Sequence, residues 1–190
     1  MSQRLPLPAL DQEAEKAWAR ALLRFREDKD AYFRTSRESP LPPTVRAAFT
    51  GLKYFDPEPA SRQERTLQRY QEPDTVVLGT SKGTRQLFKR VGYFDLNVED
   101  GLVRVHAYQS AERDYSSLFI PFRDATSGKE SYGAARYLDL EVEHDDAYAL
   151  DFNYAYNPYC AYSEDYVCPL PPAENWLKVH IRAGERKFHD

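Results

Sequence analysis

The residue types that could do chemistry include two cysteines, Cys160 and Cys168, in the segment NYAYNPYCAYSEDYVCPLPPAENW. A structural zinc site needs four nitrogen or sulfur ligands with short spacing inside each pair, and the seven residues between these cysteines make a loose pair. A catalytic thiol needs a base beside it, and the sequence ties no histidine to either cysteine. We therefore expect no metal and interpret the segment as a rigid structural loop that includes Asn157, Cys160, Cys168 and Asn175. A zinc site and a disulfide are the alternatives.

A second candidate site follows from charges at the ends of two apolar rows. Leucine, isoleucine and phenylalanine alternate with other residues over 118–122, and Asp124 is the next residue on that face. Apolar residues alternate in the same way over 138–142, and Arg136 comes before them on the same face. A hairpin would bring the two charges together, and a buried arginine needs a carboxylate partner. We predict Asp124, with Glu130 as second choice, within salt-bridge distance of Arg136.

This charged pair allows more than one interpretation. It can be an ion pair that fixes the loop between the two strands, or part of a ligand site at an open end of the sheet. In the second case we expect a small polar or anionic ligand and the candidate residues Arg123, Asp124, Glu130, Arg136, Asp151, Asn153 and Glu185. One alternative is an enzyme, a hydrolase or isomerase that uses these carboxylates as acid and base. The other is a structural or interaction protein without a small-molecule site.

One helix and many short strands would position these residues. Apolar residues recur at helical spacing over 10–33, where Asp11 can cap the helix. From residue 65 the period changes to two, which predicts strands at 65–70, 75–80, 85–91, 93–98, 102–108, 117–123, 137–143, 148–153 and 177–182. We expect a mainly β (α+β) fold with its β-rich core over 65–183. The pattern favours an antiparallel β-barrel or sandwich with the long N-terminal helix packed on it.

Composition limits the function classes. A chain of 190 residues fits a single domain, 1–190, and the net charge of −4 is spread over interleaved acids and bases. Because nucleic-acid binding needs a concentrated basic face, we expect no such partner. The N-terminal sequence MSQRLPLPAL has no signal-peptide core, and no apolar run is long enough to span a membrane, so we expect no membrane association and a cytoplasmic location. Nucleotide-binding glycine motifs are missing, so we expect no cofactor; the oligomeric state is not predicted.

Several unusual strings occur in a fixed order along the chain: IPFRDATSGKESYGAARYLD, LDFNYAYNPYCAY, CPLPPAEN and IRAGER. Together they resemble a bacterial and archaeal family catalogued as domain of unknown function sixteen eighty-four, and the resemblance covers nearly the whole chain. It implies no activity. It does imply that a set of polar, loop-centred positions recurs: Arg123, Asp124, Thr126, Gly128, Glu130, Tyr132, Arg136, Asp139, Asp151, Asn153, Asn157, Cys160, Cys168, Glu174, Asn175 and Glu185.

Overall fold

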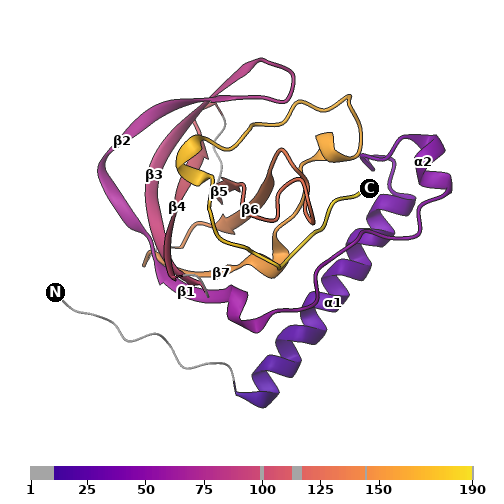
Figure 1. Ribbon diagram of the computed structural model, residues 1–190, viewed down its shortest axis with the longest axis horizontal. Helices are drawn as coiled ribbons and strands as arrows, with labels where there is room; N and C mark the ends of the chain where they lie inside the picture. The colour runs from indigo at the N-terminus through magenta and orange to yellow at the C-terminus, as the bar shows by residue number, and fades with distance from the viewer. Residues whose placement is uncertain (1–10, 99–100, 113–116, 144, 190) are drawn as a thin grey trace.

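The computed structural model describes residues 11–98, 101–112, 117–143 and 145–189 (Figure 1). Two helices come first, α1 (Gln12–Thr35) and α2 (Pro43–Ala47). The strands follow as β1 (Arg62–Thr66), β2 (Gln68–Gly79), β3 (Arg85–Val98), β4 (Gly101–Ser110), β5 (Ser117–Phe122), β6 (Arg136–Glu141) and β7 (Ala147–Asp151). Short 3-10 turns occupy Pro59–Ser61, Phe152–Tyr154, Tyr159–Ala161 and Ala173–Asn175. The helix predicted over 10–33 is thus α1, although residue 10 itself lies outside the described residues.

The strands form two antiparallel sheets. The larger has the order β2-β3-β4-β5-β6, and the smaller pairs β1 with β7. Because β2 and β6 are edge strands, the large sheet is open rather than closed into a barrel. The main core includes Phe94, Ile120 and Leu138 from the large sheet and Leu150 from β7, so it lies between the two sheets. This sandwich-like arrangement with one long N-terminal helix confirms the predicted mainly β fold class.

Two predicted strand boundaries are wrong because the chain uses β-bulges where the sequence suggests breaks. The gap between the predicted strands 65–70 and 75–80 lies inside β2, where the pairing with β3 shifts register between Arg69 and Asp74. The predicted strands 85–91 and 93–98 are one strand, β3, whose pairing with β4 shifts register between Arg90 and Gly92. A Cβ at Gly92 would lie 2.5 Å from the carbonyl oxygen of Gln68, so only glycine allows this close approach of β2 and β3.

The segment 177–182, predicted as a strand, belongs to no strand in the structure. Its alternation is nevertheless real, because Leu177 and Ile181 are buried and the residues between them are more exposed. Period-two burial reports which side chains face the core, and it does not guarantee a neighbouring strand with free backbone groups. Here the first part of the extended segment pairs with residues 123–125, through the Leu177 N–H to the Arg123 carbonyl at 2.7 Å and the Ala125 N–H to the Val179 carbonyl at 2.9 Å. The backbone of Ile181 binds side chains, as described below.

Helix α1 packs against the strands through a few long polar side chains as well as apolar ones. Trp18 donates its indole N–H to a carboxylate oxygen of Asp151 at 2.6 Å, and Lys29 forms an ion pair with Glu185 at 2.5 Å. Figure 1 shows α1 running along one side of the molecule, with the yellow C-terminal segment extending from the strands toward it. The polar contacts therefore fix α1 against residues near the ends of β7 and of the chain.

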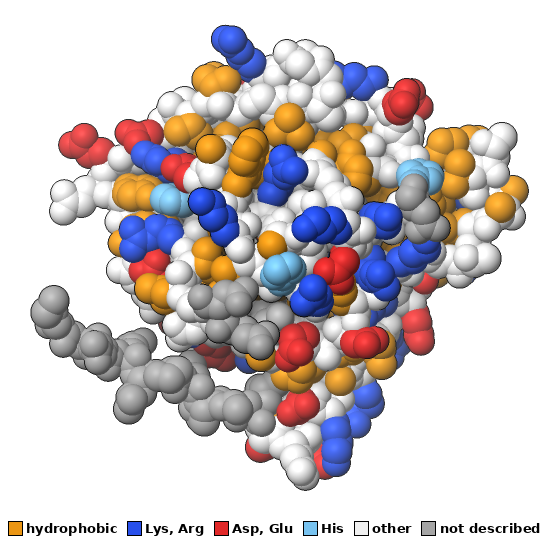
Figure 2. Space-filling model, in the orientation of Figure 1, with side chains coloured by type: hydrophobic (Ala, Val, Ile, Leu, Met, Phe, Trp, Pro, Cys, Tyr) orange, Lys and Arg blue, Asp and Glu red, His pale blue; other side chains and the backbone are white. Residues whose placement is uncertain are grey.

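The surface mixes charged and apolar side chains. On the face shown in Figure 2, hydrophobic side chains lie in separate groups between Lys, Arg, Asp and Glu side chains. Scattered apolar groups of this kind are ordinary for a folded protein surface. Among the residues that the structure describes, no helix has the length and apolar character needed to cross a membrane.

Candidate functional site

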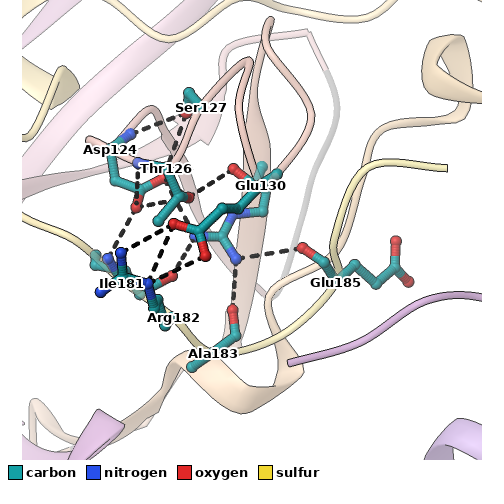
Figure 3. A network of polar contacts seen from close by, with 10 residues as sticks. Asp124, Thr126, Ser127, Glu130, Ile181, Arg182, Ala183 and Glu185 are labelled. Atoms are coloured by element: carbon teal, nitrogen blue, oxygen red, sulfur yellow. Dashed lines mark hydrogen bonds and ion pairs between the residues drawn. The ribbon is translucent and has the colours of Figure 1, made fainter. Parts of the chain in front are cut away.

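Arg136 and Asp124 meet in the interior, at the end of the β5–β6 hairpin. The guanidinium is 3.2 Å from the Asp124 carboxylate and the residue is only 1% exposed, which confirms the predicted ion pair. Its two terminal nitrogens also bind backbone carbonyls of the C-terminal segment, those of Ile181 at 2.7 Å, Ala183, and Glu185 at 3.3 Å, while the buried Nε has no hydrogen-bond partner among the described residues. Figure 3 shows these three residues arranged around the network. Burial lowers the pKa of Arg136 and Asp124 opposes the shift, so the guanidinium stays charged.

The Asp124 carboxylate is surrounded by further donors. It accepts hydrogen bonds from the Thr126 hydroxyl at 2.9 Å, the Ser127 hydroxyl at 3.3 Å and the backbone N–H of Ile181 at 2.8 Å. Thr126 in turn contacts the Ser131 hydroxyl at 2.8 Å. Figure 3 shows Thr126 beside Asp124 and Ser127 above both. A buried ion pair is tolerated when its remaining hydrogen-bonding capacity is met, and this one is largely met within the fold.

Two of the predicted residues lie nearer the surface than this pair. Glu130, the second choice for Arg136, instead forms an ion pair with Arg182 at 3.0 Å. Arg123 is half-buried, and its guanidinium stacks on the Trp176 ring with 5.0 Å to the ring centroid. Neither residue contacts the Asp124 carboxylate through a described hydrogen bond, so the structure does not bring Arg123 and Glu130 into one site with the Asp124–Arg136 pair.

Asp151 and Asn153 form a separate polar centre under α1. Besides Trp18, the Asp151 carboxylate accepts the Asn153 backbone N–H at 3.0 Å and the Asn153 side-chain amide at 2.8 Å. Asn153, 1% exposed, also binds both the N–H and the carbonyl of Glu58 at 2.8 Å. The two residues thus connect β7, the helix and the segment that precedes β1.

Glu185 connects three other segments. Its carboxylate accepts hydrogen bonds from Lys29 at 2.5 Å, from the Tyr162 hydroxyl at 2.5 Å and from the backbone N–H of Asn157 at 2.8 Å. The residue is 1% exposed. Its neighbour Gly184 has a φ of +77°, which turns the chain so that the preceding carbonyl faces Arg136 and the Glu185 side chain faces Lys29. Glu185 therefore joins α1 to the loop after β7.

Asn175 substitutes for a strand residue where β4 and β5 separate. Its amide accepts the His106 N–H at 2.8 Å and donates to the His106 carbonyl at 2.9 Å and to the Pro121 carbonyl at 2.8 Å. These are backbone groups of β4 and β5, which pair with each other only at Tyr108 and Phe119. A fully buried amide in this position satisfies groups that a sheet ladder would otherwise satisfy.

The two cysteines are both free and lie close together. The backbone N–H of Cys160 is 3.3 Å from the sulfur of Cys168, and the Tyr132 hydroxyl is 3.9 Å from the sulfur of Cys160. Among the described residues, no group of three or more His, Cys, Asp or Glu side chains is placed to hold a metal ion. The loop that carries both cysteines also covers the outer face of the large sheet, through a bridge between Thr80 and Pro169.

A cavity of about 460 Å³ lies on this outer face, away from the predicted residues. Its walls include Phe88 of β3, Phe119 of β5, Tyr137 and Asp139 of β6, and Tyr156 of the covering segment. Backbone hydrogen bonds between Tyr137 and Tyr156, at 2.8 and 2.9 Å, attach that segment to the edge of β6. The cavity therefore forms where a distant part of the chain closes over the sheet.

Four aromatic rings form a continuous wall of the cavity. Phe88 contacts Phe119 at 5.4 Å between ring centroids, Phe119 contacts Tyr137 at 4.8 Å, and Tyr137 contacts Tyr156 at 5.7 Å. The Tyr137 hydroxyl donates to the Pro169 carbonyl at 2.5 Å, which fixes that ring. Rings held in this way give a preformed apolar surface for a ligand.

Asp139 supplies the charge in this wall. Its carboxylate accepts a hydrogen bond from the Tyr156 hydroxyl at 2.5 Å. The residue is exposed by surface area, and its carboxyl lies in the wall of this open cavity, where neighbouring atoms partly desolvate it. This desolvation raises the pKa of Asp139, and the hydrogen bond from Tyr156 opposes the rise. Perturbed carboxyl groups in concave sites are typical of functional sites.

The interior network supports this cavity from behind. The Lys29 ammonium that pairs with Glu185 also lies over the Tyr156 ring, 4.9 Å from its centroid. Tyr156 then holds Asp139 through its hydroxyl. A predicted residue, Glu185, is thus linked to the cavity through helix α1 without lining it.

Replacing Asp139 by asparagine is expected to stabilise the protein at neutral pH, raising Tm by ~1–2 °C, because solvent screening at an open cavity limits the effect to ~0.5 kcal/mol. The desolvated charge costs folding free energy that a neutral amide avoids. Since the folded pKa lies above the ordinary value of 3.8, stability is lost as pH rises through it and regained as pH falls. Thermal melts at about pH 7 and about pH 4 should show an advantage that shrinks at the lower pH. If the variant is less stable than wild type at pH ~7, the Asp139 carboxylate stabilises the fold, and the prediction is wrong.

The sequence contained a signal for this cavity that alternation alone misreads. Tyr137 and Asp139 share one face of the predicted strand 137–143, and a polar face is usually assigned to solvent. An aromatic residue on that face is the sign that something covers it. Asp139 belongs to the set implied by the family resemblance, but it was not among the candidate ligand-binding residues.

Comparison with known proteins agrees with the resemblance. The family model "Protein of unknown function (DUF1684)" matches residues 47–186. A solution NMR structure of an uncharacterised protein from Haloarcula marismortui is 40% identical, with a TM-score of 0.70, over 92% of this chain and 96% of that chain. No curated protein matches the sequence. The chain therefore belongs to the DUF1684 family.

Proposed function

We propose that this protein binds a small organic ligand in the cavity beside Asp139, and that the ligand carries a positive charge on an apolar body. The observation that carries the proposal is the Asp139 carboxylate, which is desolvated in an aromatic wall and has the neutral Tyr156 hydroxyl as its described hydrogen-bond partner. A carboxylate in this state gains more from a cationic ligand than from any other kind.

The rest of the cavity supports the same ligand class. Of the described residues that line it, the charged ones are Asp139 and Glu112, both acidic. Aromatic rings attract cations through their negative faces, and quaternary ammonium groups are recognised by such walls in other proteins. The volume of about 460 Å³ lies within the ordinary range of small-molecule sites. An anionic ligand would meet repulsion here.

We assign the ligand to this cavity rather than to Arg136, where the sequence suggested an anion. The terminal nitrogens of Arg136 bind Asp124 and three carbonyls, so a ligand at these nitrogens would have to displace contacts that hold the C-terminal segment. This supports a structural role for the Asp124–Arg136 pair. The proposal includes a cytoplasmic location, which the two free cysteines favour.

Binding of benzyltrimethylammonium to the full chain, measured by calorimetry, tests the proposal. We expect the cation to bind and 3-phenylpropionate, an anion of similar size, to bind far more weakly. Asp139→Asn should weaken binding of the cation about tenfold, while Glu64→Gln, which removes an equal charge on the smaller sheet, should leave it unchanged. Equal binding of both probes, or full affinity in Asp139→Asn, would contradict the proposal.

A further inference from the structure

The loop after β7 brings two sulfur atoms together without a metal-site geometry. Because a backbone nitrogen lies ~1.5 Å from its own Cα, the 3.3 Å contact places the Cys168 sulfur within ~4.8 Å of the Cys160 Cα. That separation suits a disulfide after rotation of the side chains. The short loop between the two residues therefore holds them in reach of each other while both are reduced.

The sulfur of Cys160 lies 3.9 Å from the Tyr132 hydroxyl and beside Cys168, whose own sulfur is 3.3 Å from the Cys160 nitrogen. The Cys168 thiol, the Tyr132 hydroxyl and the Ser81 hydroxyl lower the pKa of Cys160 to about 6, with the Cys168 thiol as the largest cause and burial as the opposing effect. The titratable groups that face it, Cys168, Tyr132 and Tyr137, all have raised pKa values and stay neutral. At neutral pH a thiolate thus lies beside a thiol.

The two cysteines differ in access to solvent. Cys160 is half-buried, whereas Cys168 is buried and 7% exposed. The Cys168 backbone is also held in place, because its N–H donates to the Ser81 hydroxyl at 3.1 Å and its carbonyl accepts the Ser81 N–H at 2.9 Å. An accessible thiolate next to a shielded thiol is the arrangement in which one cysteine is oxidised first and the other resolves the product.

We propose that Cys160 and Cys168 form a reversible dithiol–disulfide couple that is oxidised by hydroperoxides. The Cys160 thiolate attacks one peroxide oxygen, an S–O bond forms, the O–O bond breaks, and the leaving alkoxide or hydroxide takes a proton from water. Cys168 then attacks the Cys160 sulfenic acid; the S–S bond forms, the S–O bond breaks, and water leaves with the thiol proton. The two thiols lose two electrons and the hydroperoxide gains them. A thiol reductant restores the pair, as for transient disulfides of reducing compartments.

Treatment of the reduced full-length protein with hydrogen peroxide tests this inference. We expect intact mass spectrometry to show loss of two hydrogen atoms, reversal by dithiothreitol, and protection of both cysteines from alkylation. The oxidation rate should rise with a midpoint near pH ~6, instead of ~8.5 for an ordinary cysteine. Tyr132→Phe should raise the midpoint by ~0.5–1 pH unit, because one donor to the thiolate is removed.

Two variants separate the steps. In Cys168→Ser, the sulfenic acid on Cys160 should persist, which adds the mass of one oxygen atom. Added dimedone should then form a C–S bond with Cys160, and the sulfenic oxygen should leave as water. In Cys160→Ser, rapid oxidation should disappear; circular dichroism and melting check that both variants fold. Measurements on the wild-type chain alone can also overturn the proposed dithiol–disulfide couple. A protein that gains oxygen atoms under peroxide without losing two hydrogens, or whose rate has its midpoint near pH ~8.5, would overturn the inference.

Discussion

Replacing Arg136 by methionine is expected to lower the free energy of unfolding by about 3–5 kcal/mol. The variant leaves the Asp124 carboxylate buried without its cation, and the carbonyls of Ile181 and Ala183 lose their donors. Each buried polar group left unpaired adds its own desolvation cost. Urea unfolding of the variant and the wild type, with the slope compared, measures the difference.

A matched control for this variant is available on the surface. Arg182→Met breaks the ion pair with Glu130, in which the arginine side chain is 58% exposed, and should cost less than ~1 kcal/mol. Adding Asp124→Asn to Arg136→Met should recover part of the loss, because no unpaired charge then remains in the interior. If Arg136→Met unfolds within ~1 kcal/mol of wild type, the pair is not the support that we describe.

Replacing Gly184 by alanine is expected to cost at least ~3 kcal/mol. The backbone has a φ of +77°, and an added Cβ would lie 2.4 Å from the Ala155 carbonyl oxygen and 2.7 Å from that of Phe152. Those atoms belong to backbone and cannot rotate away. Movement of residue 184 would also displace Glu185 from Lys29 and pull the neighbouring carbonyls from Arg136.

Gly83 provides the comparison that isolates this crowding. It has a nearly equal φ of +74° in the β2–β3 turn, and a Cβ there would meet nothing within 4 Å. Gly83→Ala should therefore cost only about 1 kcal/mol, the penalty of the left-handed conformation itself. Thermal or urea unfolding of both variants measures the contrast. Similar losses at the two positions would show that close packing around Gly184 has no energetic role.

The parts of this fold that sequence reasoning predicted depend on local periodicity. The apolar rows over 118–122 and 138–142 continue past their strand ends to Asp124 and Arg136, and both rows face the same core, except for the exposed Val142. Because a side chain's face depends only on its parity along a strand, the ion pair could be predicted without knowing the topology. The same logic predicted α1 from its helical period.

The parts that sequence reasoning missed depend on distant segments. Alternation over 177–182 could not show that this backbone pairs with residues 123–125 and also binds the side chains of Arg136 and Asp124. Nor could it show that the chain around Tyr156 returns to cover the outer face of β6 and turn Asp139 from a surface acid into a cavity acid. These features follow from tertiary contacts, which single-strand patterns do not contain.

The central claim is that the site lies beside Asp139, and that the buried network around Arg136 is its support. Backbone amide NMR spectra recorded while benzyltrimethylammonium is added to the wild-type chain test this most directly. We expect chemical-shift changes at cavity residues such as Phe119, Tyr137 and Asp139, with little change at Asp124 and Ile181. Changes centred on Asp124 and Ile181, or none at the cavity, would contradict the account.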